Sequence, residues 1–331
     1  MASTTDAPAA SRTPKAQPRV LRFLSALGLI RESPVGVIGL CLVGFWVIMA
    51  LTADLQLAAG LIFPPTATLM PLAFPGAEYI VPAGRMVLNQ PVADVCQPIL
   101  EGAKAGQFYC GTFWLGTDHI GRDILSRLIF GSQTVLIYAP LATLCAYLVG
   151  VPMGLAAGYK GGWVDDVLSF IANVILSFPV LVLYVLVITL IGASGTNILL
   201  AVTFASAPGI MRIVRGLALD LRNREYVLAA QTRGEPTWRI LFIEILPNAR
   251  GPLIVDSMLR LGYTIITIGV LGFLGLGLPP PNPDWGGMIN ETRQLMMAFP
   301  HMAIFPCIAI SSLVLGFNLL ADGLREISLR D

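Results

Sequence analysis

The chain has 331 residues, of which 55% are hydrophobic and only 12% are charged, and its mean hydropathy is +0.75. A soluble domain carries about a quarter charged residues, so this composition excludes an ordinary soluble protein and indicates a chain embedded in a lipid bilayer. The formal net charge of +1 says nothing about partners, and we expect no nucleic-acid partner.

The first 33 residues precede the first long apolar run. Residues 1–19 are rich in Ala, Pro, Ser and Thr and have too little apolar surface to offset the entropy of ordering, which predicts a disordered tail. Residues 20–33 alternate apolar side chains at helical spacing with arginines, a pattern typical of an interfacial helix. No signal-peptide apolar region follows the first cations, so we expect the N-terminus to be retained.

Six apolar segments are long enough to cross a membrane, since a spanning helix needs about 20 mostly apolar residues. They are residues 35–54, 134–157, 167–191, 198–219, 252–277 and 302–320. Ser33 and Pro34 suit the N-cap and first residue of the first helix, at 34–54. We therefore predict an all-α membrane protein with six transmembrane helices.

Cations determine the expected orientation of these helices. Lys and Arg gather in both terminal segments and in residues 158–166 and 220–251. The positive-inside rule then makes both termini cytoplasmic and places residues 55–133 outside, where we expect a loop and an amphipathic helix lying along the membrane. Cys96 and Cys110 in that loop form either a disulfide or two free thiols.

A polar motif stands at the end of the external segment. Thr117 or Asp118 suits the N-cap of the amphipathic helix. Asp118, His119 and Asp123 resemble a metal-ligand set, but a solvated cap is the favoured interpretation, and we expect no metal site. Trp285, in a later external segment, suits an interfacial anchor. The motif residues are Gly116, Thr117, Asp118, Gly121, Arg122 and Asp123.

Polar features also interrupt the predicted spans. Asp256 and Arg260 are four residues apart and share one helix face, either as an internal ion pair or as residues that line a pathway. Pro208 and Gly209 indicate either a packing kink or a break beside such a pathway. The segment with Gly161, Gly162 and Asp165 is either a tight connector or a second contact with a cytoplasmic partner.

The stretch "EYVLAAQTRGEPTWRILFIEILPNARGP", residues 225–252, lies between two apolar spans. Its first helix is expected to end at Gly234, a residue type that tolerates the left-handed conformation. A second helix is expected to begin at Pro236 and to be limited by Pro247. Exposed Tyr226 and Val227 suit insertion into a partner's groove. The alternative is an amphipathic loop resting on lipid headgroups.

This stretch resembles the EAA motif of binding-protein-dependent ABC import permeases. The segments "LAAQTRG" and "ILP" match it at Ala229, Ala230, Gly234, Leu246 and Pro247, whereas Leu228 stands where the family usually has Glu. Blocks such as "LGTDHIGRDILSRLIFGSQ" and "LGFLGLGLPPPNPDWGGMI" resemble the C-type permease of the dipeptide, oligopeptide and nickel branch. The resemblance covers nearly all of the chain from residue 112 onward.

The resemblance implies the type I ABC importer permease fold, with a core at 134–331 and a coupling loop at 220–251, in the plasma (inner) membrane of a prokaryote. It implies a second, B-type permease, two ATPase subunits or domains and an external substrate-binding protein as partners. ATP and Mg would be bound by the ATPases, and this chain is expected to bind no cofactor. The ATPase contacts would be Glu225, Tyr226, Ala229, Ala230, Gly234, Leu246 and Pro247.

The resemblance makes di- or oligopeptides the expected solutes, with nickel chelates or other small solutes as the alternative. A stand-alone secondary transporter remains a further hypothesis, which the cytoplasmic helical insert disfavours. No GxxxxGK[ST], HExxH or GxSxG pattern occurs in the sequence, so neither ATP binding at a Walker A site nor catalysis by this chain is expected.

Overall fold

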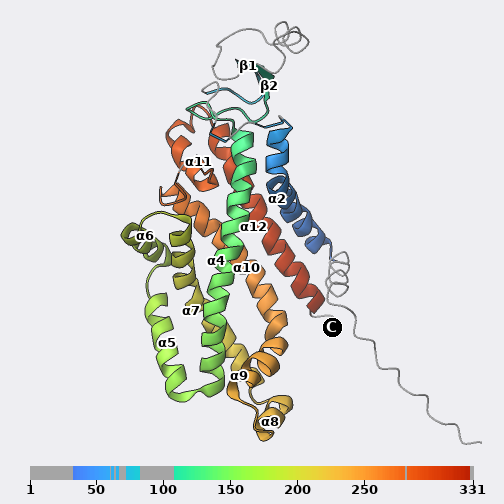
Figure 1. Ribbon diagram of the computed structural model, residues 1–331, viewed down its shortest axis with the longest axis vertical. Coiled ribbons are helices and arrows are strands. Elements are labelled where there is room, and N and C mark those ends of the chain that lie inside the picture. The colour runs from blue at the N-terminus through green and yellow to red at the C-terminus, as the bar shows by residue number, and fades with distance from the viewer. Residues whose placement is uncertain are drawn as a thin grey trace, which may run out of the picture.

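A computed structural model of the chain describes residues 33–59, 61–62, 65–66, 72–82, 108–279 and 282–328. The predicted tail at 1–19 and nearly all of the predicted interfacial helix at 20–33 lie outside these residues. The described helices form an elongated bundle (Figure 1). In chain order the elements are α2 (Pro34–Ala58), β1 (Ala77–Pro82), β2 (Phe108–Phe113), α4 (Ile124–Lys160), α5 (Gly162–Leu176), α6 (Val180–Ile191), α7 (Gly195–Leu221), α8 (Glu225–Thr232), α9 (Thr237–Arg239), the π-helix η1 (Ile240–Ile245), α10 (Leu246–Phe273), α11 (Trp285–Thr292), the 3₁₀ turn η2 (Arg293–Leu295) and α12 (His301–Ser328).

Within the described residues, five helical stretches are long and apolar enough to cross a membrane, or six if the bent pair α5–α6 counts as one span. The predicted span at 167–191 is this pair, whose two helices meet at 87°. Pro179 is the N-cap of α6, and its ring disfavours helical geometry at the residue before it, so the helix breaks there. Ser33 caps α2 by accepting from the Gly36 amide, which confirms the predicted start of the first helix.

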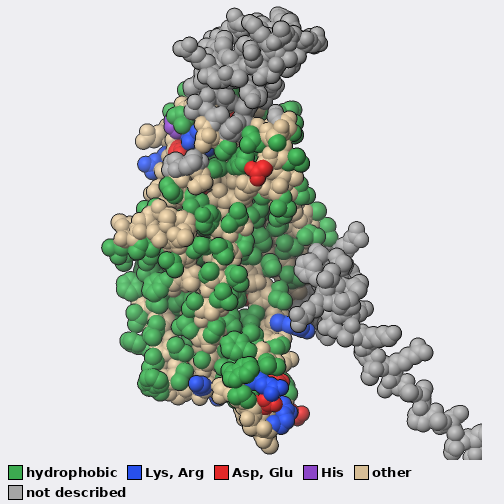
Figure 2. Space-filling view, viewed as in Figure 1, with side chains coloured by type: hydrophobic (Ala, Val, Ile, Leu, Met, Phe, Trp, Pro, Cys, Tyr) green, Lys and Arg blue, Asp and Glu red, His purple; other side chains and the backbone are tan. Residues whose placement is uncertain are grey.

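The ends of the bundle differ in character (Figure 1). The strands β1 and β2 pair antiparallel at one end, with Ala77 opposite Phe113, so the prediction of an all-α chain is wrong for this small sheet and right for the spans. The opposite end carries α8 and α9, and the start of α2 and the end of α12 lie toward that same half. Between the two ends the visible surface is largely hydrophobic (Figure 2).

The amphipathic helix expected along the membrane is absent from the described residues, because residues 124–133 form the first turns of α4. Its N-cap is Asp123, whose carboxylate accepts from the Ser126 amide at 2.8 Å. Thr117 and Asp118, the predicted caps, have other partners. Thr117 Oγ1 accepts from the Ala73 amide at 2.8 Å, and Asp118 pairs with arginines.

Helices α4 and α7 pack closely through a glycine ridge on α4, formed by Gly150, Gly154 and Gly158. A Cβ added at any of the three would lie 2.5–2.7 Å from a backbone oxygen of α7. Glycines four residues apart fall on one helix face, and small residues at that spacing let two membrane helices approach closely. This contact fixes the last turns of α4 against α7, toward the end of the bundle that carries α8.

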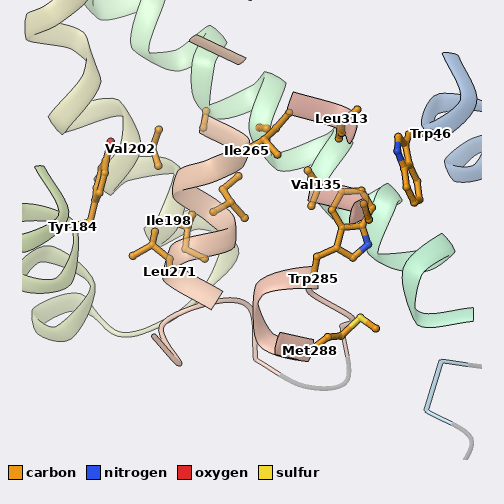
Figure 3. Packing of buried hydrophobic residues seen from close by; sticks show 14 of the residues in the cluster. Trp46, Val135, Tyr184, Ile198, Val202, Ile265, Leu271, Trp285, Met288 and Leu313 are labelled. Carbon is orange, nitrogen blue, oxygen red and sulfur yellow. The ribbon is translucent and has the colours of Figure 1, made fainter. Parts of the chain in front are cut away.

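A larger hydrophobic core lies near the end that carries α11 (Figure 3). Trp285 is fully buried, donates from Nε1 to the Leu128 carbonyl at 3.0 Å and meets the ring of Trp46 edge-on at 4.8 Å. Its indole lies where a side chain at Gly131 would be. The interpretation of Trp285 as an interfacial anchor is therefore wrong, because tertiary packing draws α11 into the bundle.

Candidate functional site

The predicted elbow forms at the end of the bundle opposite the sheet. α8 has Arg233 as its C-cap, and Gly234 follows with φ +76°. This left-handed value confirms the predicted turn residue, because side chains other than glycine rarely adopt it. Pro236 then caps α9, and Glu235 joins the turn to α9 through an ion pair of 2.9 Å with Arg239.

The second helix of the elbow does not end at Pro247 as predicted, because Thr237–Phe273 is one continuous helical stretch. Proline lacks an amide hydrogen and normally interrupts a helix. Here the turns before it widen into η1, in which the Leu246 amide donates to the Leu241 carbonyl five residues earlier. Pro247 then occupies the first turn of α10, where a missing donor is tolerated. The elbow is thus continuous with a membrane span.

One face of the elbow is buried against its own chain. Val227 and Ala230 of α8 have no exposed surface, and they pack in a cluster with Ile240 and Ile245 of η1 and Val214 of α7. Val227 was expected to be exposed for a partner, and this expectation is wrong. Both residues anchor α8 to the bundle.

Tyr226 is half-buried beside that cluster. Its hydroxyl oxygen is buried and has no hydrogen-bond partner in the described part of the chain. Desolvation raises the pKa of the phenol above its ordinary value, with Arg224 opposing the shift and Glu244 adding to it.

The other face of the elbow is open. Leu228 is 47% exposed and Trp238 is 61% exposed, and Glu225 and Ala229 are exposed as well. Figure 2 shows Lys and Arg together with Asp and Glu side chains at this end of the molecule. Apolar groups ringed by charge are typical of an interaction site. Leu246 is half-buried and Pro247 is exposed beside this face.

The segment Gly161–Asp165 connects α4 to α5 at the same end. Gly161 and Gly162 have φ of +65° and +53°, which explains two glycines in so tight a connection. Asp165 forms two hydrogen bonds with Arg215 of α7, at 2.5 and 2.6 Å. Asp165 therefore braces α5 on α7, as a connector would.

Pro208 and Gly209 lie within α7, which continues through both residues, so of the two alternatives, a packing kink or a break, the break is not found there. Asp256 and Arg260 form the expected pair, with Nε to Oδ2 at 2.8 Å. The Tyr147 hydroxyl also donates to Asp256. Gly209, Arg260 and the ends of α5 and α6 border a cavity of about 200 Å³. Spacing predicted the ion pair, whereas no sequence signal indicated Tyr147, which comes from another helix.

The motif at 116–123, which was predicted to be external, folds into an ionic cluster instead of a solvated cap. Asp118 is buried and accepts from Arg122 at 2.6 Å and from Arg127 at 2.8 Å. Glu291 of α11 pairs with the same two arginines. Gly116 and Gly121 allow the turn through positive φ. Arg127 and Glu291 were not among the predicted site residues, because their sequence distance from Asp118 gives no sign of contact.

Asp284 lies near that cluster, where its carboxylate accepts from the Gly287 amide at 3.1 Å. Burial raises the pKa of Asp284 to about 6, against smaller opposing contributions from the amides of Gly287 and Gly286 and from Arg127. No group of His, Cys, Asp and Glu side chains suited to a metal ion occurs in the described ranges. The alternatives for Cys96 and Cys110 lie outside the described residues, because Cys96 does.

Comparison with known proteins finds a transport family and individual transport permeases. The family described as "Binding-protein-dependent transport system inner membrane component" matches residues 150–331. The glutathione transport system permease protein GsiD of Pectobacterium atrosepticum is 42% identical over 203 residues, covering 61% of this chain and 67% of that protein. The dipeptide transport system permease protein DppC of Alkalihalophilus pseudofirmus is 39% identical with the same coverage.

Solved structures are similar as well. A chain of the inward-facing MetNI methionine ABC transporter superposes with a TM-score of 0.52 at 18% identity, covering 62% of this chain and 97% of that chain. At this identity the likeness shows the fold alone.

Proposed function

The chain belongs to the family of binding-protein-dependent transport system inner membrane components, and from this premise we propose that it is the C-type permease subunit of an ATP-driven peptide importer. It forms the translocation pathway with a second, B-type permease. Two ATPase subunits or domains supply the energy, and an external binding protein delivers the solute. The chain itself binds no cofactor, since ATP and Mg belong to the ATPases.

The two-faced elbow is the observation that carries this proposal. Its inner face is buried in the bundle, while its outer face presents Leu228, Ala229 and Trp238. A partner that binds the outer face therefore displaces α8 together with the helices packed beneath it, because the inner face of α8 is buried against η1 and α7. We assign this outer face to the ATPase contact, with Glu225, Tyr226 and Pro247 at its edges. Leu228 supplies an apolar contact where relatives of this kind usually have Glu.

Ala230, Gly234 and Leu246 have supporting roles in this scheme. Ala230 is fully buried and anchors α8, Gly234 permits the sharp turn, and Leu246 packs beside the cluster under the elbow. Gln231 donates to the Tyr159 hydroxyl at 3.1 Å and so ties α8 to the end of α4.

Nucleotide-driven docking has to shift the pathway between two states. A shift from 1:99 to 99:1 requires about 5.5 kcal/mol of differential binding. The buried cluster transmits such a preference because close-packed interiors resist deformation. The elbow, both termini and the Gly161–Asp165 connector then lie on the cytoplasmic side, in agreement with the concentration of Lys and Arg there.

The proposed solutes are peptides. The relatives described above are named for glutathione and for dipeptides, and both are compounds with peptide-type amide bonds and free carboxylates. Measurement of ATP-dependent uptake with and without the ATPase subunits distinguishes this proposal from a stand-alone transporter, which would not need them.

Gly234→Trp tests the elbow. The left-handed conformation costs other residues about 1–2 kcal/mol, and an indole at this open position obstructs the docking face. We expect the variant chain to reach the membrane in wild-type amount while the assembled transporter loses ATP-dependent peptide uptake. Full uptake by the variant would refute the docking assignment.

Two control variants distinguish an obstructed docking face from backbone strain as the cause of lost uptake. Gly76 has φ +82° and, like Gly234, nothing within 4 Å of an added Cβ, but it precedes β1 at the opposite end of the bundle. Gly76→Trp is therefore expected to retain uptake. Gly234→Ala shares the backbone strain without the bulk, so its uptake should lie well above that of Gly234→Trp.

A further inference from the structure

A cavity between α4, α5, α6, α7 and α10 lies in the membrane-spanning part of the bundle, and a charged side chain, that of Arg260, lines it. Hydroxyl side chains from α4, α6, α7 and α10 line it as well. These hydroxyls are those of Thr143, Tyr184, Ser206, Tyr263, Thr264 and Thr267. An ionised group at this depth is costly and usually marks a functional position.

The guanidinium of Arg260 is held from one side. Its Nε donates to Asp256 at 2.8 Å, and Asp256 also accepts from the Tyr147 hydroxyl. In the described ranges Asp256 is the only carboxylate that pairs with Arg260. Asp256 thus neutralises and orients the arginine through Nε and leaves the terminal amino groups, Nη1 and Nη2, without an anionic partner.

Gly209 keeps the space beside these amino groups free. A Cβ at position 209 would lie 3.4 Å from Nη1 and 3.5 Å from Nη2, so a side chain there would cover them. Leu176 and Val180, which flank the break between α5 and α6, line the same cavity. Broken membrane helices often border solute sites, and here the break and the arginine share one space.

The size of the cavity limits what it can hold. About 200 Å³ is below the range of roughly 300–1,000 Å³ typical of pockets that enclose a whole small molecule. The cavity therefore accepts one end of a solute. The end that matches a guanidinium fork is a carboxylate, which receives two parallel N–H bonds from it. Lysine, a point charge, lacks this geometry.

We propose that Arg260, oriented by Asp256 and left uncovered by Gly209, binds the carboxylate of a peptide as the peptide passes through the permease. The proposal rests on the proposed function, because it takes peptides as the solutes. It assigns to the permease its own recognition of the solute's charged end, in addition to any selection made by the binding protein.

The test compares alanyl-alanine with its C-terminal amide, both radiolabelled, in proteoliposomes that contain the assembled transporter and enclosed ATP. The same binding protein is used throughout, at saturating concentration and after its binding of both compounds has been shown. The quantity measured is the acid-to-amide ratio of uptake rates. Comparison of this ratio between wild type and variants cancels the preference of the binding protein.

We expect Arg260→Gln to lower this ratio at least tenfold, because hydrogen bonds to charged groups contribute enough free energy for such a factor. Arg260→Lys keeps the positive charge and loses the forked guanidinium, so its acid-to-amide ratio should lie between those of the wild type and Arg260→Gln. Arg293→Gln, the same change at an exposed arginine of η2, should keep the wild-type ratio. An unchanged ratio in Arg260→Gln, or an equal loss of acid and amide uptake, overturns the proposal.

Gly209→Ala tests the same site without changing Arg260, so that the proposal can still be judged if the arginine variants misfold. The added methyl group meets Arg260 at ordinary contact distance, so the ion pair is preserved while the amino groups are covered. We expect the acid-to-amide ratio to fall here too, and an unchanged ratio counts against the site. If the wild-type transporter takes up neither compound with ATP, the peptide function itself fails; if it takes up both and the ratio never changes, only the Arg260 assignment fails.

Discussion

The glycine ridge between α4 and α7 makes a strong prediction for a single methyl group. A Cβ at Gly154 would lie 2.6 Å from the Met211 carbonyl oxygen and 2.6 Å from the Val214 Cβ, whereas ordinary contacts begin at 3.4 Å. In Gly154→Ala the two helices therefore have to separate by about 0.8 Å, the difference between those distances. The rigid backbone on the other side cannot rotate away as a flexible side chain does.

The size of the effect follows from comparison with Gly216→Ala. Gly216 lies on α7 with nothing within 4 Å of an added Cβ. Both substitutions gain helix propensity, about 1 kcal/mol in aqueous hosts, and this gain cancels between them. Overpacking costs typically about 1–3 kcal/mol. Gly154→Ala should accordingly be less stable than Gly216→Ala by about that amount.

Thermal unfolding of the two purified variants in one detergent, at one heating rate and followed by tryptophan fluorescence, measures the difference. We expect the midpoint of Gly154→Ala to lie below that of the wild type and that of Gly216→Ala to lie at or above it. If Gly154→Ala unfolds at the same temperature as Gly216→Ala or higher, close packing at the ridge does not hold the two helices together.

Two further predictions concern the cluster near α11. Burial raises the pKa of Asp284 from 3.8 to about 6, so the folded chain binds this proton more tightly than the unfolded chain does. The proton therefore adds about 3 kcal/mol to the free energy of unfolding below about pH 4, and this contribution is lost as the pH rises through about 6. Asp284→Asn should remove this pH dependence from the free energy of unfolding, and identical slopes in both proteins would contradict it. Asp118→Asn should lower the free energy of unfolding by about 3 kcal/mol, because it leaves the buried Arg127 with a weaker set of partners. Glu291→Gln should lower it by at most about 1 kcal/mol, because the Glu291 side chain is 31% exposed. Equal losses of unfolding free energy in chemical denaturation would refute this ranking.

Features that depend on a few neighbouring residues were predictable from the sequence. Ser33 and Pro34 mark the start of α2, and Gly234 turns the elbow, because caps and left-handed turns are decided within one helical turn. The i, i+4 spacing also predicted that Asp256 and Arg260 pair. The family was predicted from collinear motifs, and the match to residues 150–331 confirms it.

Features decided by tertiary packing were not predictable in the same way. The cap of α4 is Asp123 because Asp118, an equally good capping residue, is taken by Arg122 and Arg127. Val227 is buried because η1 and α7 fold against it, although its position in an exposed-looking polar insert indicated the reverse. In each case the deciding partner lies on another element, and local pattern carries no information about it.

The candidate site shows the same division. Arg260 and Gly209 were both singled out within apolar spans, but their proximity depends on how α7 crosses α10. The Pro208–Gly209 pair left open a packing kink or a broken helix, while the break occurs before Pro179. Proline alone does not separate the two outcomes, because a membrane helix tolerates it when neighbouring helices satisfy the freed carbonyl.

The elbow and the cavity meet on a single stretch of α7. Ile210 packs in the cluster beneath the elbow and also lines the cavity, and Ala146 of α4 does both as well. Gly209 precedes Ile210 in α7 and lies beside the amino groups of Arg260. A displacement of α8 by a partner therefore has a continuous, close-packed route to the space beside the guanidinium, with no flexible loop between them. Because the glycine ridge leaves α4 and α7 little freedom to slide apart, these two helices should move as one body, so that a displacement at the elbow should also reach the cavity that both helices line.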